Sequence, residues 1–87
     1  MPKHNDRSYN SMLENWLADA LSMLGGAASV VNACRTVWQR HEKELRGMDD
    51  AFFTWQYDIR WAAHRLRRSG VMKPASKSPV GIWELED

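Results

Sequence analysis

Cysteine and histidine, the residue types that most often carry nucleophilic or metal chemistry, are few in this chain and widely spaced. Cys34 is the one cysteine, and it precedes His41 by seven residues, which places both on one face of a helix two turns apart. Two such ligands are too few for zinc, and His4 and His64 lie on other predicted segments. A nucleophile–base pair would also lack a third group to orient the base. We therefore expect no enzyme activity, no metal site and no cofactor, with His41 at the edge of the core.

The distribution of charge indicates a binding surface instead. The chain has 12 Lys and Arg against 11 Asp and Glu, for a formal net charge of +1. The segment from Ile59 to Trp83 nevertheless contains no acidic residue and six basic ones, which are Arg60, Arg65, Arg67, Arg68, Lys73 and Lys77. Such segregation on a nearly neutral chain predicts a local cationic surface.

Basic and aromatic side chains are mixed on one face of the third predicted helix, a pattern suited to nucleic acid. Arginine binds phosphate oxygens and guanine edges, and glutamine can read adenine. A cationic loop after this helix suits contact with the phosphate backbone. We expect the contacts to duplex DNA to come from Gln56, Tyr57, Arg60, His64, Arg67, Arg68, Lys73 and Lys77.

The basic and aromatic residues also have two interpretations that involve no ligand. The arginines and the loop lysines can form a solvated surface with no ligand. Trp61 lies on the same helix face as the basic residues, and we expect it to pack beneath a C-terminal hairpin, because the hairpin must cover apolar surface.

Apolar spacing predicts the first two helices. Ser11 and Glu14 have the spacing of a capping box at the start of the first, and Gly25 and Gly26 end it. Ser29 caps the second helix, which ends at Gly47, and the link between the two helices can add a short strand.

The third helix and the segment after it complete the predicted fold. Asp49 or Asp50 caps this helix, and Ser69-Gly70 ends it. After Gly70 the spacing of apolar residues changes from that of a helix to that of strands. Two short strands are expected, over Val71–Lys73 and Val80–Leu85, with an exposed loop between them. The expected fold is mainly α with a small β-hairpin (α+β), a three-helix winged helix-turn-helix.

Length and composition allow one domain. With 87 residues, of which 44% are hydrophobic, we expect a flexible segment over residues 1–8 and one winged-helix domain over residues 9–87. A lone cysteine excludes a disulfide scaffold, and no apolar run suits a signal peptide or a membrane span. We therefore expect a cytoplasmic protein without membrane contact.

Three stretches of the sequence resemble a known family. They are Trp61-Ala62, Leu66-Arg67-Arg68-Ser69-Gly70-Val71-Met72 and Pro79-Val80-Gly81-Ile82-Trp83-Glu84-Leu85, and Gly26-Ala27-Ala28-Ser29-Val30 fits as well. This pattern resembles the N-terminal winged-helix domain of Mrr-type restriction endonucleases. The resemblance implies a DNA-recognition module without the nuclease domain. We expect the protein to act as a small transcription regulator or as a recognition subunit of a larger system. The sequence departs from the family in having Asp49, Asp50 and Phe52-Phe53 where a more basic approach to the third helix is usual.

An alternative function is protein–protein interaction or dimerisation without DNA. The first predicted helix places Met12, Trp16 and Met23 toward one edge and Leu21 toward the other. Together with Met48, Phe53 and Met72, this is more apolar surface than a small domain buries easily. An exposed apolar patch of this kind predicts a homodimer or a partner protein.

Overall fold

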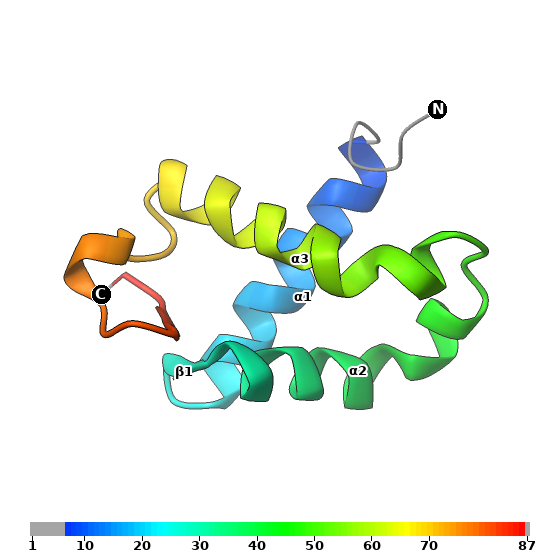
Figure 1. Ribbon diagram of the computed structural model, residues 1–87, viewed down its shortest axis with the longest axis horizontal. Helices are drawn as coiled ribbons and strands as arrows, with labels where there is room; N and C mark the ends of the chain where they lie inside the picture. The colour runs from blue at the N-terminus through cyan, green and yellow to red at the C-terminus, as the bar shows by residue number, and fades with distance from the viewer. Residues whose placement is uncertain (1–6, 87) are drawn as a thin grey trace.

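A computed structural model of the chain describes residues 7–86. Within these residues, three helices surround one core (Figure 1): α1 (Arg7–Met23), α2 (Val30–Arg46) and α3 (Ala51–Arg68). Strand β1 (Ala27–Ser29) links α1 to α2, and the 3-10 turn η2 (Ala75–Lys77) and strand β2 (Ile82–Glu84) follow α3. The expected fold class, mainly helical with a small antiparallel sheet beside three helices, is confirmed.

Helix α1 begins earlier than the sequence indicated. It includes Arg7 and Ser8, which were expected in a flexible segment, whereas residues 1–6 lie outside the described residues. Ser11 is therefore inside the helix and the predicted capping box is wrong. Glu14 instead accepts a hydrogen bond from Arg65 of α3, and this long-range pairing has no local signal in the sequence.

The predicted start of α2 is confirmed, and that of α3 is confirmed in part. The Ser29 hydroxyl accepts a hydrogen bond from the Asn32 backbone N–H at 3.1 Å, and Gly47 ends the helix. Asp50 takes the N-cap position of α3, but its side chain makes no capping hydrogen bond. Its backbone is already in the helical region, with φ −66° and ψ −35°, whereas a capping side chain normally requires an extended backbone.

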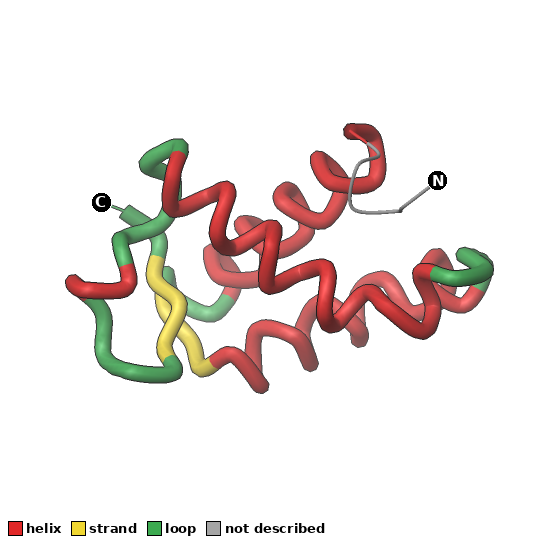
Figure 2. Tube along the Cα trace, turned by 45° about the horizontal axis from the view of Figure 1, so that its top comes forward, coloured by secondary structure: helices red, strands yellow, loops and turns green. Residues whose placement is uncertain are grey.

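The small sheet forms between segments far apart in the sequence. Strand β1 pairs antiparallel with β2, and Ala28 lies opposite Trp83. The segment predicted as the first hairpin strand makes only an isolated bridge, from Met72 to Leu85, with a hydrogen bond on each side of it. The wing, residues 71–86, is therefore joined to itself by this one bridge, and the regular sheet partner of β2 is β1, the link between α1 and α2 (Figure 2).

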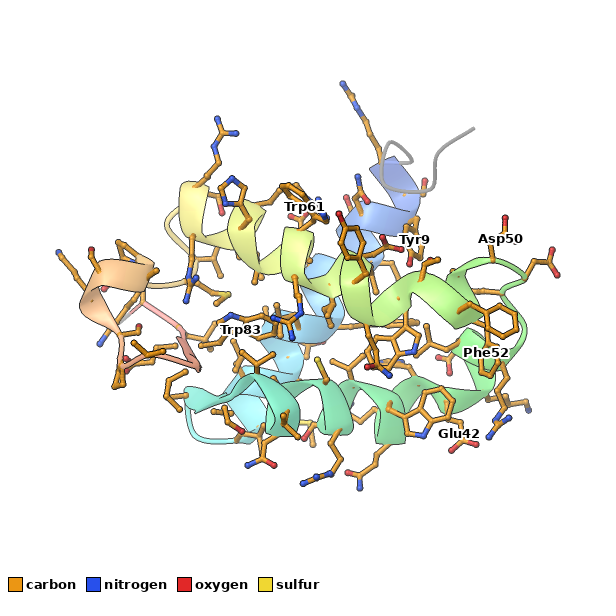
Figure 3. The ribbon with its side chains drawn as sticks, in the orientation of Figure 1. Tyr9, Glu42, Asp50, Phe52, Trp61 and Trp83 are labelled. Carbon is orange, nitrogen blue, oxygen red and sulfur yellow. The ribbon has the colours of Figure 1, made fainter. Side chains whose placement is uncertain are left out.

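The core takes up most of the apolar surface that suggested an exposed patch on α1. Leu21 and Met72 are fully buried, and Met12 and Trp16 are partly buried against the core. Of the four α1 residues that suggested a patch, only Met23 is exposed. The Trp16 ring stacks on His41 with 3.8 Å between centroids, which confirms His41 at the edge of the core. Trp83 is buried as well, and it closes the core from the wing side (Figure 3).

Asp58 is a buried carboxylate in α3. It accepts hydrogen bonds from the Tyr9 hydroxyl at 2.7 Å and from the Thr54 hydroxyl at 2.9 Å. Burial raises the pKa of Tyr9, and the neighbouring Asp58 carboxylate raises it further, because both oppose a phenolate at this place. The network joins the first turn of α1 to the middle of α3.

Candidate functional site

The outer face of α3 carries the largest group of exposed aromatic side chains in the part of the chain that the structure describes. Phe53, Tyr57 and Trp61 follow one another at intervals of four residues and are 83%, 62% and 46% exposed. The prediction that Trp61 packs beneath the wing is therefore wrong, because Trp83 and Met72 fill that place. Trp61 lies on the edge of α3 away from α2 (Figure 3).

A shallow depression of about 290 Å³ lies on this outer face. Tyr57, Arg60, Trp61 and His64 line it, and the His64 ring meets the Trp61 ring edge-to-face at 5.9 Å between centroids. Three of the predicted DNA contacts thus lie around one hollow, with an indole beside them. Arg68 is exposed one turn farther along the same face.

Several basic residues of the predicted cationic surface bind other parts of the protein. Arg65 pairs with Glu14 at 2.6 Å. Arg67 donates a hydrogen bond from Nε to the carbonyl oxygen of Lys73 at 3.1 Å, and the Lys73 ammonium lies 3.6 Å from the Glu84 carboxylate. The Arg67 hydrogen bond attaches the wing to α3, and these partners leave Arg67 and Lys73 less available to a ligand.

The other basic residues of this surface remain open to solvent. Arg60 and Arg68 form no ion pair with any residue of the described range 7–86, and Lys77 is exposed in η2. Figures 1 and 2 show the turn that contains Lys77 on the same side of the molecule as the C-terminal end of α3. Asp49 and Asp50 are exposed at the opposite end of the helix, so α3 is acidic where it begins and basic where it ends.

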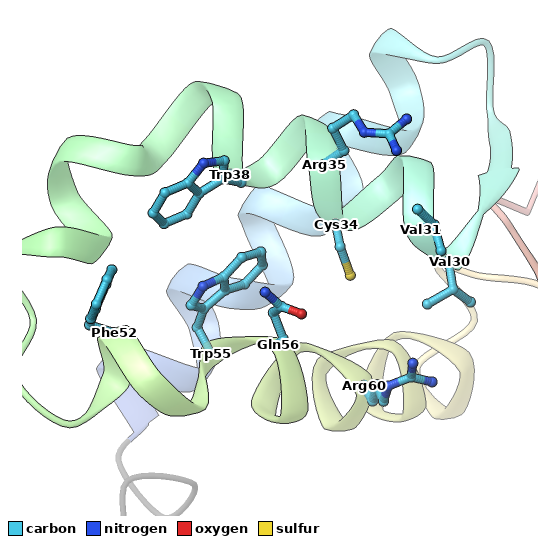
Figure 4. Close-up of a pocket in the computed structure, with 9 residues that line it drawn as sticks. All are labelled: Val30, Val31, Cys34, Arg35, Trp38, Phe52, Trp55, Gln56 and Arg60. Carbon is cyan, nitrogen blue, oxygen red and sulfur yellow. The ribbon is translucent and has the colours of Figure 1, made fainter.

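A deeper groove separates α3 from α2 (Figure 4). Its volume is about 440 Å³, and five residues of α2 and four of α3 line it. Gln56 lies in this groove and not among the outer aromatic residues, whereas Arg60 lines both the groove and the outer depression. Cys34 forms part of the wall, and partial burial raises the pKa of its thiol, opposed by the positive charge of Arg60.

The groove was not predicted from the sequence. On the side of α2 that lines the groove, Val31 is largely exposed and Cys34 is only partly buried, although apolar spacing alone suits both to a core. One signal was present: the side of α3 that faces this stripe carries Gln56 and Arg60, whose long polar side chains do not fill a core.

Residues 7–86 contain no group of three or more His, Cys, Asp and Glu side chains placed to hold a metal ion. No helix in the described range is long and apolar enough to cross a membrane. Comparison of the chain with protein-family models, curated proteins and solved structures finds no match. The resemblance to the winged-helix domain of Mrr-type endonucleases therefore remains a prediction from the sequence.

Proposed function

We propose that the protein binds duplex DNA through the C-terminal half of α3 and the adjacent wing, as a small regulator or as the recognition subunit of a larger system. The observation that carries this proposal is the exposure of Arg60 and Arg68 on one helix face without an ion pair in the described range. A partner of this kind also implies a cytoplasmic location, in line with the single cysteine.

The charge distribution along α3 suggests how the helix would lie on DNA. Phosphates repel Asp49 and Asp50 at its start, so the close approach falls to Arg60, His64 and Arg68 farther along. Lys77 of the wing would reach the backbone from the same side. Arg67 and Lys73 would hold the wing in place instead of contacting phosphates, since both already have partners within the protein.

Salt dependence is the sharpest test of this proposal. Each phosphate neutralised by an arginine contributes about −0.9 to the slope of log K against log salt concentration. We expect Arg60→Gln with Arg68→Gln to weaken binding to a fluorescein-labelled duplex and to make this slope shallower by about 2. Fluorescence anisotropy over a series of salt concentrations measures both effects.

A matched control removes the same charge elsewhere. Arg40→Gln with Lys43→Gln takes two positive charges from exposed positions of α2 and changes no residue of α3. We expect this variant to keep most of the affinity. Equal losses in the two double variants, or binding of the parent protein that does not respond to salt, would contradict the proposed interface.

Protein–protein interaction is the second candidate, and the exposed Phe53, Tyr57 and Trp61 favour it. An aromatic stripe of this kind is more typical of protein interfaces than of phosphate contacts. If the protein binds another protein through these residues, its affinity should change little with salt concentration. The double variant Tyr57→Ser with Trp61→Ser should lose the interaction. Sedimentation velocity of the parent and this variant tests the homodimer form, since a concentration-dependent dimer should disappear in the variant.

A further inference from the structure

We propose that the groove between α2 and α3 binds a small aromatic carboxylate, with its ring against Trp38 and Trp55 and its carboxylate at Arg60. The groove shares Arg60 with the proposed DNA-binding face. The remaining lining residues lie outside that face, and the proposal does not depend on DNA binding. It follows from the shape of the groove, the distribution of aromatic and polar side chains along it, and its charge.

The end of the groove near the α2–α3 turn is aromatic. Trp55 forms a buried wall, and the Trp38 ring lies nearly parallel to it, with 6.1 Å between centroids and 9° between planes. Phe52 closes this end, 6.3 Å from the Trp38 ring (Figure 4). Flat aromatic rings pack favourably against such walls through offset and edge contacts.

The middle and the other end of the groove are polar on the α3 side. Gln56 follows Trp55, and Arg60 lies one turn farther along, opposite Val30 (Figure 4). No described lining residue is acidic, and Arg60 has no ion pair with a described residue. A guanidinium in this position suits a carboxylate, which it can bind through two parallel hydrogen bonds.

The size of the groove favours a small molecule as the occupant. At about 440 Å³ it lies within the range of about 300–1,000 Å³ that is typical of small-molecule sites. Such sites combine apolar walls with a few polar groups that orient the ligand. Here aromatic side chains line one end and Arg60 lies toward the other, while the second lining cation, Arg35, donates a hydrogen bond to the Asn32 side chain.

The test uses 2-naphthoate as the probe and isothermal titration calorimetry as the readout. We expect the parent protein to bind 2-naphthoate about tenfold more tightly than the neutral 2-naphthamide, because only the carboxylate gains a charge-assisted bond to Arg60. Arg60→Gln should reduce affinity for 2-naphthoate by about tenfold and remove the preference over the amide. Arg68→Gln, which removes the same charge outside the groove, should leave affinity within about twofold.

Cys34 reports the location of the probe because it is the one cysteine of the chain and lines the groove. Saturating 2-naphthoate should slow alkylation of Cys34 by N-ethylmaleimide several-fold at mildly alkaline pH, and 2-naphthamide at the same concentration should slow it less. Absence of binding, equal affinity for the two probes, equal losses in the two arginine variants, or unprotected Cys34 would overturn the proposal. So would a dimer in sedimentation equilibrium that dissociates in Arg60→Gln, because the groove would then be covered by a second copy of the chain.

Discussion

The two sides of α3 are built differently. Toward α1, apolar side chains that include Leu13, Leu17 and Ile59 are fully buried, and Asp58 and Arg65 both have partners on α1. Toward α2, the helix leaves a groove of about 440 Å³ whose α3 wall includes two long polar side chains. Both neighbours contribute to the core, but only the contact with α2 leaves a groove open to a ligand.

The difference indicates that buried positions around α3 stabilise the fold, whereas exposed positions along the groove are available for binding. Well-packed interiors lose several kcal/mol when a large side chain is removed, whereas exposed positions tolerate change. Truncation of the side chains buried between α1 and α3 should therefore cost several kcal/mol, whereas the exposed rim of the groove should accept substitution. Arg60 lies where the groove and the outer face of α3 meet, so the two candidate ligand surfaces share one cation.

The largest expected effect comes from opening a cavity on the α1 side. Leu13→Ala should lower the free energy of unfolding by about 2–5 kcal/mol, because Leu13 is fully buried. Val31→Ala, on the rim of the groove, should change it by less than about 0.5 kcal/mol. Urea denaturation followed by circular dichroism measures both, and similar losses would remove the contrast between the two sides.

A smaller effect is expected from the buried hydrogen bond between Tyr9 and Asp58. Tyr9→Phe removes the hydrogen bond that the Tyr9 hydroxyl donates to the buried Asp58 carboxylate and should cost about 1–3 kcal/mol at neutral pH. Tyr57→Phe, on the exposed outer face, removes the same hydroxyl without breaking a buried bond. Urea denaturation should therefore find Tyr57→Phe close to the parent protein in stability.

The same pair of variants predicts a difference at alkaline pH. The pKa of Tyr9 is raised in the folded protein, so above the ordinary value of 10.0 the unfolded chain loses this proton more readily than the folded one. The contribution of the Tyr9 hydroxyl to the free energy of unfolding is therefore fully present below pH 10.0 and decreases as the pH rises above that value. Tyr9→Phe should lose less stability than the parent over this window, and a Tyr57→Phe variant with the same reduced loss would contradict the assignment.

The smallest expected effect concerns the ion pair between Arg65 and Glu14. Their side chains are 30% and 28% exposed, and one Arg65 nitrogen, Nη2, is buried without a hydrogen bond in the described structure. Glu14→Gln should cost about 1 kcal/mol, because it weakens the one ion pair of a partly buried guanidinium. Glu42→Gln, which affects the exposed pair with Arg46, should cost less than about 0.5 kcal/mol in the same denaturation measurement.

Much of the helical framework was predictable because its signals are local. The serine cap of α2 and the glycine that follows α2 depend on neighbouring residues along one helix. The start of α1 was not predictable from Ser11 and Glu14, because Glu14 is used by Arg65, which lies 51 residues away. Trp61 and Trp83 both suited the position beneath the wing, and only three-dimensional packing shows which of them occupies it.

The sequence by itself determined three helices and a basic segment from the middle of α3 into the wing, because these follow from residue type and periodic spacing. The tertiary structure alone decided which cations stay available, since Arg65, Arg67 and Lys73 find partners within the protein whereas Arg60 and Arg68 have no ion pair in the described range. It also decided that β2 pairs with β1 and that a groove opens between α2 and α3. Partners and cavities depend on how distant segments approach one another, and helical periodicity describes only one segment at a time.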